Sequence, residues 1–121
     1  MRLLSWITAI NVLVACGFSI AGLVAPQAML PVGSTSTEAS RIFAMYAAAR
    51  AIPLAIVALA VIYKRSALGL LTLGILAGII QLADAGVGLY QHDIGKSVGP
   101  LVIALLQFYA IYLFYKSSSR M

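Results

Sequence analysis

The sequence predicts an all-α integral membrane protein, an up-down bundle of four helices forming a single domain, 1–121. Hydrophobic residues make up 63% of the chain and charged residues 9%, and the mean hydropathy is +1.05, whereas a water-soluble domain is about 45–50% apolar. A helix that spans a bilayer needs about 20 mostly apolar residues. Four segments meet this requirement and leave no room for a soluble domain between them: 3–25, 38–63, 67–91 and 97–116.

The first predicted helix, 3–25, contains a pattern that is typical of a lipoprotein cleavage site, Leu13-Val14-Ala15-Cys16. The chain stays apolar over 17–24, where a mature lipoprotein would turn polar, so we expect an uncleaved helix. Cys16 is the single cysteine and cannot form an intramolecular disulfide. We therefore interpret it as a small buried hydrophobic residue.

The second and third helices are predicted to follow each other closely. The segment Thr35-Ser36-Thr37-Glu38 has the spacing of a capping box, which indicates a helix that starts near residue 38. Only Lys64-Arg65-Ser66 separates this helix from the next one, which leaves room for a tight turn. We therefore expect 38–63 and 67–91 to form an antiparallel hairpin in direct contact.

The charges predict the orientation of the bundle. The net charge is +5, and five basic residues fall beyond the span ends on one side: Arg2, Lys64, Arg65, Lys116 and Arg120. The other side has two basic residues, diluted by two acidic ones: Arg41, Lys96, Glu38 and Asp93. By the positive-inside rule, both termini should be cytoplasmic and the protein should lie in the inner (plasma) membrane of the cell. This pattern explains the basic charge without a nucleic-acid partner.

The third predicted helix carries one stripe of small and polar residues: Gly74, Gly78, Gln81, Ala85, Gly88 and His92. Small residues let helix backbones approach closely in lipid. We expect the stripe to be a packing seam, either against a neighbouring helix or against a second copy in a homodimer through the Gly74 and Gly78 face.

The candidate site consists of ionisable residues inside the spans. Arg50 lies fifteen residues before Arg65 and Asp84 nineteen after it, so their depths differ by about 6 Å at 1.5 Å per residue. Tyr46 and Arg50 share one helix face, and Gln81 and Asp84 share another. If these faces meet, Arg50 and Asp84 form a buried salt bridge with Tyr46 and Gln81 beside it.

Two interpretations of this cluster remain open. The pair can be purely architectural, since membrane ion pairs need no further role. It can also be functional, because a charge in hydrocarbon needs a partner, water or a ligand. Most of the other non-cytoplasmic polar side chains are expected between this cluster and the outer membrane surface. Among these, Gln91 and His92 are the candidate ligand contacts. His92 could also carry protons, although a loop histidine beside an acid is usually only solvated.

Metal and cofactor chemistry is not expected. Zinc sites use several histidine or cysteine ligands, and this chain has one of each. No phosphate-binding loop, nucleophile elbow or haem motif occurs in the sequence.

Three segments resemble a known family. Ala48-Ala49-Arg50-Ala51-Ile52-Pro53-Leu54, then Lys64-Arg65, then Leu82-Ala83-Asp84-Ala85 are similar to the R-x-x-x-L and L-x-D-A pattern of small four-helix bacterial membrane proteins. That family is a domain of unknown function loosely grouped with DoxX-like proteins. The resemblance covers roughly Tyr46 to Leu113, and Pro53 departs from the small or apolar residue of the pattern. It implies the fold and the Arg50 and Asp84 positions, and no activity.

Three classes of function follow from these observations. The cluster could bind a lipophilic small molecule, with or without acid-base catalysis such as isomerisation, epoxide opening or cyclisation, in which Asp84 is the acid or base, Arg50 tunes it and Tyr46 is a donor. A small dimeric transporter could use Asp84 as a proton-coupling site. The chain could also be an accessory subunit of a larger membrane complex. We rank the first class first, because a paired Arg50 would hold Asp84 charged and disfavour proton cycling.

Overall fold

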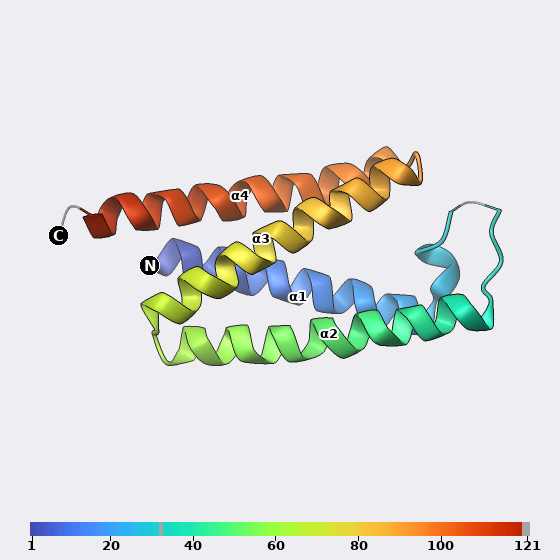
Figure 1. The fold of residues 1–121 in the computed structure, drawn as a ribbon, viewed down its shortest axis with the longest axis horizontal. Helices are drawn as coiled ribbons and strands as arrows, with labels where there is room; N and C mark the ends of the chain where they lie inside the picture. Colours follow the sequence, from blue (N-terminus) through green and yellow to red (C-terminus); the bar gives the residue numbers. More distant parts are fainter. Residues whose placement is uncertain (32, 120–121) are drawn as a thin grey trace.

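The computed structural model describes residues 1–31 and 33–119, without the side chains of Ala28 and Ser119. These residues form four long helices and one short 3-10 helix (Figure 1): α1 Arg2–Val24, η1 Pro26–Ala28, α2 Glu38–Tyr63, α3 Ala67–Tyr90 and α4 Ile94–Ser119. The predicted all-helical, four-helix architecture is confirmed. By length and composition, each of the four long helices can span a membrane.

Side-chain caps begin three of these helices. The Thr37 hydroxyl accepts a hydrogen bond from the Ser40 backbone N–H at 3.1 Å, and the Ser40 hydroxyl accepts one from Thr37 N–H at 2.9 Å. The Ser66 hydroxyl accepts from Gly69 N–H at 3.2 Å at the start of α3. An Asp93 carboxylate oxygen accepts from Lys96 N–H at 3.2 Å, so α4 begins at Ile94, three residues earlier than expected. Each cap satisfies a backbone donor that the first helical turn leaves unpaired.

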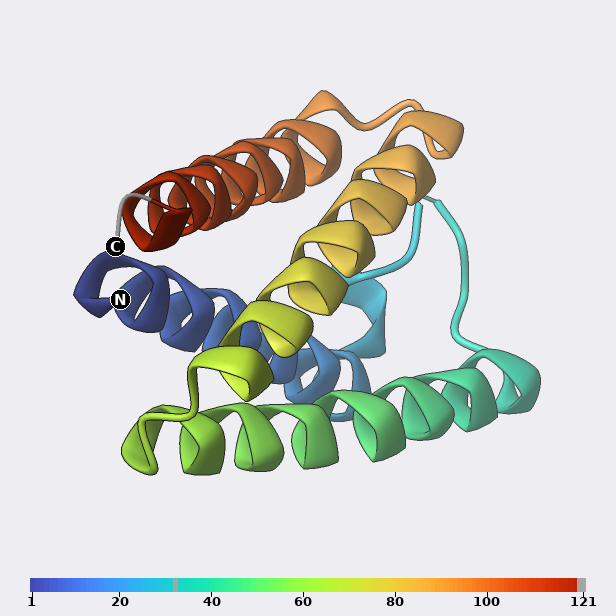
Figure 2. The same cartoon turned by 60° about the vertical axis from the view of Figure 1, so that its left-hand side comes forward.

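The helices pair as α1 with α2 and α3 with α4, and α1 contacts all three of the others. The expected direct contact along α2 and α3 is largely absent. They touch near the turn at 64–66, where Val61 packs against Gly69 and Ala58 shares a cluster with Ala77. Beyond that region the two helices diverge (Figures 1 and 2). The start of α1 and the end of α4 lie at the same end of the molecule as this turn.

The glycines of α3 explain why it packs against α4 and α1. A Cβ added at Gly88 would lie 2.6 Å from the Lys96 backbone of α4, and one at Gly78 would lie 2.8 Å from the Phe108 ring. At Gly74 it would lie 2.9 Å from the Gln107 amide nitrogen. The stripe is therefore a seam between helices of one chain. Both glycines of the suggested homodimer face, Gly74 and Gly78, are buried inside the chain.

The core between the helices is small. One cluster of buried residues joins Val12 of α1, Ala55 and Ala58 of α2, and Ala77 of α3, and a second joins Leu4, Leu70 and Ala110. Many large apolar side chains lie on the outside instead, among them Trp6, Phe43 and Leu105. Such a surface would be unstable in water and suits the hydrocarbon of a bilayer.

We expect Gly88→Ala to destabilise the fold, because its Cβ would meet backbone atoms of α4 that cannot rotate away. Overpacking of this kind typically costs about 1–3 kcal/mol. Unfolding of the purified protein by titration with sodium dodecyl sulfate measures the change. The matched control is Gly86→Ala, one half-turn away in α3, where an added Cβ meets no atom within 4 Å. Equal stability of the two variants would contradict the close approach of α3 and α4.

Candidate functional site

Arg50 and Asp84 do not form the buried salt bridge that the sequence suggested. Both side chains are exposed, and no charged residue is buried within 1–31 and 33–119. An Arg50 Nη1 donates to the Tyr46 carbonyl oxygen at 3.1 Å, and its guanidinium carbon lies 5.5 Å from the centre of the Tyr46 ring. Asp84 makes no hydrogen bond or ion pair with any residue that the structure describes. The pair is absent because α2 and α3 diverge.

The two charges nevertheless lie on facing sides of their helices. Leu54 of α2 and Ala77 of α3 belong to the same apolar cluster, where the helices are still close. Arg50 precedes Leu54 by four residues and Asp84 follows Ala77 by seven, so each keeps the face of its helix that reaches this cluster. Both lie on the side of the cluster away from the turn, where α2 and α3 separate (Figure 2).

The charged groups also match in position along the helices. The Arg50 guanidinium folds back onto Tyr46, which lies 17 residues before the end of α2 at Tyr63. Asp84 lies 17 residues after the start of α3 at Ala67. At 1.5 Å per residue, both are about 26 Å from the turn along their own helix. Pro53, inside α2, also lacks the N–H that would bond to the Ala49 carbonyl beside Arg50.

Gln81, expected beside Arg50, belongs to a different polar cluster. Its amide nitrogen donates to the Asn11 side-chain oxygen at 2.8 Å. The Asn11 amide donates to the Gln107 side-chain oxygen at 3.0 Å, and the Gln107 amide donates to the Thr8 hydroxyl at 2.9 Å. All four side chains are at most 2% exposed. We call this cluster the amide chain, and it connects α1, α3 and α4.

The amide chain was not predicted from the sequence, although the Asn and Gln residues inside the apolar helices indicated it. Asn11, Gln81 and Gln107 are the three Asn or Gln residues within the four long helices, one on each of three helices. No buried side-chain nitrogen or oxygen among the described residues lacks a partner. Because its side chains bond to one another across three helices, the cluster holds these helices together inside the chain.

The end of the molecule opposite the turn at 64–66 holds the remaining candidates. Gln91 and His92 line a hollow in the turn before α4, together with Pro31, Asp93, Ile94 and Gly95. The Gln91 side-chain oxygen accepts from Lys96 Nζ at 3.1 Å, and Lys96 also donates to the Leu30 carbonyl at 3.2 Å. The structure thus does not place Gln91 and His92 with Arg50 and Asp84. Within the described residues, no three His, Cys, Asp or Glu side chains group as metal ligands.

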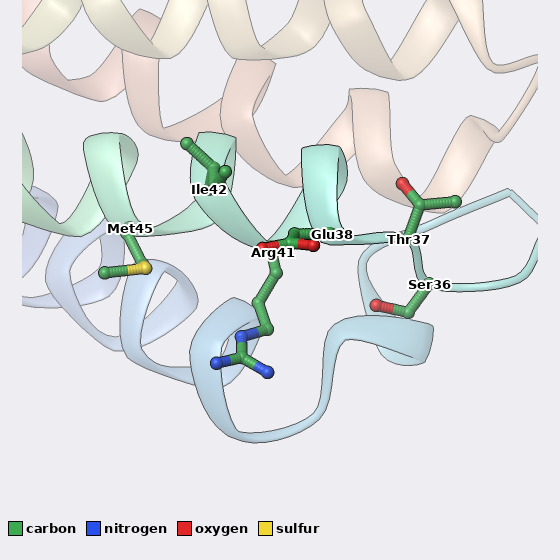
Figure 3. Close-up of a pocket in the computed structure, with 6 residues that line it drawn as sticks. All are labelled: Ser36, Thr37, Glu38, Arg41, Ile42 and Met45. Carbon is green, nitrogen blue, oxygen red and sulfur yellow. The ribbon is translucent and has the colours of Figure 1, made fainter.

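A second hollow lies at the start of α2 (Figure 3). Its lining combines the polar residues of the cap with two apolar side chains: Ser36, Thr37, Glu38, Arg41, Ile42 and Met45. Arg41 extends from α2 towards the segment after α1. Both hollows are open depressions at the helix ends, and neither is lined by Arg50 or Asp84.

Comparisons with protein families, with curated proteins and with solved structures find no match for this chain. The likeness to the DoxX-like group therefore stays a prediction.

Replacing Gln107 by Leu should destabilise the bundle, because it removes two hydrogen bonds and leaves buried polar atoms of Asn11 and Thr8 without partners. We expect a loss of about 1–3 kcal/mol in the free energy of unfolding. Thermal unfolding in detergent, followed by circular dichroism, gives the difference. The control is Thr72→Val, which removes one exposed hydrogen bond to Leu68 within the same helix. A Gln107→Leu protein as stable as this control would show that the amide chain does not hold the helices.

Proposed function

We propose that this chain is a multi-pass membrane protein that binds a lipophilic small molecule between the facing sides of α2 and α3. Arg50 and Tyr46 contact the ligand from α2, and Asp84 contacts it from α3. One observation carries the proposal: an arginine and a carboxylate, both exposed, lie at matching positions on the facing sides of two diverging helices.

The energetic cost of these charges supports a ligand. An arginine in the middle of a span costs about 2.5–3.5 kcal/mol on insertion scales unless it has a partner, water or a ligand. Here the chain gives Arg50 one carbonyl and one aromatic ring, and it gives Asp84 no partner among the described residues. Leu54 and Leu73, which lie on the same two helices nearer the turn, are apolar and suit a lipophilic ligand body. Asp84 would serve as the acid or base if the site is catalytic.

The same arrangement favours a second candidate, a small proton-coupled transporter. Asp84 is not in contact with Arg50, so the arginine does not hold it in the charged form through a direct bond. This removes the main argument against proton exchange at Asp84. Transport of a lipophilic molecule and binding of it share the same site residues, and vesicle uptake driven by a proton gradient separates them.

For the membrane, we propose the inner (plasma) membrane with both termini in the cytoplasm. The end that carries the turn at 64–66, the start of α1 and the end of α4 also carries Arg2, Lys64, Arg65 and Lys116. Arg120, counted with this group, lies outside the described residues. The opposite end carries Arg41 and Lys96 near Glu38 and Asp93. This imbalance supports the orientation through the positive-inside rule.

Single cysteines should report opposite sides of the membrane. In a Cys16→Ser background, Ser34→Cys should react with an impermeant thiol reagent added to intact cells, and Ser118→Cys should react only after the membrane is opened. The positive-inside rule predicts this order. Labelling of both positions from outside would refute the orientation without touching the ligand site.

Removing both charges should abolish ligand binding while the protein still folds. A single Arg50→Leu or Asp84→Leu change leaves the other charge exposed at membrane depth, so the informative variant carries both substitutions. A photoreactive lipophilic probe in nanodiscs should label the facing sides of α2 and α3 in the native protein, and this labelling should fall at least about tenfold in the double variant. Mass spectrometry locates the adducts.

The control for this experiment is Leu105→Ala, which changes an exposed apolar residue of α4. It should leave the labelling of α2 and α3 unchanged. Uniform labelling of all lipid-facing surfaces, or the same labelling of the double variant, would mean that Arg50 and Asp84 form no ligand site.

A further inference from the structure

The two charged groups of the proposed site differ in what they require. A guanidinium stays protonated in proteins and has five N–H donors, whereas a carboxyl group can take up a proton and become neutral. The chain uses one Arg50 nitrogen for the Tyr46 carbonyl and stacks the guanidinium over the Tyr46 ring. No acidic side chain among the described residues pairs with Arg50. The proposed site therefore lacks an anion that pairs with the Arg50 guanidinium.

We infer that the ligand is a lipophilic carboxylic acid dissolved in the bilayer, bound as its carboxylate by Arg50, with Asp84 accepting its proton. This inference rests on the proposed function and names the class of ligand. Carboxylates fit a guanidinium through two parallel hydrogen bonds in one plane. The Arg50 guanidinium carbon lies 5.5 Å from the centre of the Tyr46 ring and one Nη1 donates to the Tyr46 carbonyl, so the group has further N–H donors for such a planar partner.

The depth of the site selects a carboxylic acid over a phosphate. Tyr46, where the guanidinium lies, is eight residues inside the start of α2 at Glu38, about 12 Å along the helix. A phosphate group stays charged and hydrated and belongs at the membrane surface, since ions are costly in hydrocarbon. A carboxylic acid with an apolar tail reaches this depth in its neutral, protonated form.

Binding then exchanges one proton without changing the charge of the site. Before binding, the site holds the Arg50 cation and the Asp84 carboxylate on opposite walls. The acid transfers its O–H proton to an Asp84 oxygen, and the new carboxylate accepts hydrogen bonds from Arg50. Two carboxyl groups next to one cation share a single proton in this way, because both cannot be ionised cheaply. The product is an ion pair between Arg50 and the ligand beside a neutral Asp84.

The test compares three photoreactive probes that share one alkyl chain and end in a carboxylic acid, an alcohol or an amine. Nanodiscs of phosphatidylcholine hold the full chain and supply no anionic lipid. We expect the acid to label α2 and α3 at least about tenfold more strongly than the alcohol or the amine, as a charge-assisted bond predicts. Arg50→Gln should remove this preference. Arg41→Gln, at another exposed arginine of α2, should keep it.

Asp84→Asn tests the proton transfer. The variant should still bind the acid, because Arg50 is unchanged, but each bound acid should release one proton to a weakly buffered solution. The native protein should release none, since Asp84 keeps the proton. A pH-indicator dye measures the difference, and equal release from both proteins would overturn the role of Asp84.

The outcomes separate the inference from the proposed function. If the alcohol labels the site as strongly as the acid, or the amine labels it best, the site exists but the ligand is not a carboxylate held by Arg50. If no probe labels α2 and α3 above the rest of the surface, the proposed function fails and the inference fails with it.

Discussion

The packing of this bundle depends on the amide chain, the buried hydrogen-bonded cluster that connects α1, α3 and α4. Thr8, Asn11, Gln81 and Gln107 would each be costly alone in hydrocarbon, and each finds its partner only on another helix. Their three hydrogen bonds hold α1, α3 and α4 in one arrangement, since a rotation of any of these helices would break a buried hydrogen bond. The glycines of α3 then let α4 approach closely enough for Gln107 to reach Asn11.

The second helix, α2, takes no part in this chain. It is held to α1 by small and apolar residues, with Ala44 near Gly22 and Ala55 near Val12, and to α3 by the short turn and the residues beside it. A helix fixed at one end and along one face can diverge from α3 without breaking a hydrogen bond of the amide chain. The separation of Arg50 from Asp84 is thus a consequence of where the neutral polar residues lie.

Much of the fold could be predicted from the sequence, because apolar length alone identifies four helices that are long enough to span a membrane. The start of α2 at Glu38 was also predicted, although the capping box is formed by Thr37 and Ser40 and not by Thr35 and Glu38, the pair with the S/T-x-x-E spacing. The choice of helix partners could not be predicted. A glycine stripe predicts that another helix packs closely against it, but it does not indicate which helix.

The candidate site was predicted only in part. Counting residues from the turn placed Arg50 and Asp84 within about 6 Å of the same depth and on defined helix faces, since these follow from periodicity; the closer match of the charged groups comes from the Arg50 side chain folding back onto Tyr46. It could not give the distance between the helices, which depends on the packing of α1 and α4. Gln81 was expected beside the charged Arg50 and Asp84, but its partner is the neutral Asn11. The unusual neutral residues, Asn11 and Gln107, were the better guide to what is buried.

The long sequence separation within the amide chain has a consequence for biosynthesis. Asn11 precedes its partners Gln81 and Gln107 by 70 and 96 residues. At a synthesis rate of about 5–20 residues per second, the first helix waits roughly 5–20 s for its last partner. Until α3 is made, α1 has only α2 beside it, and α2 has no amide side chain. Asn11 therefore needs water or another temporary hydrogen-bond partner until the second half of the chain is made.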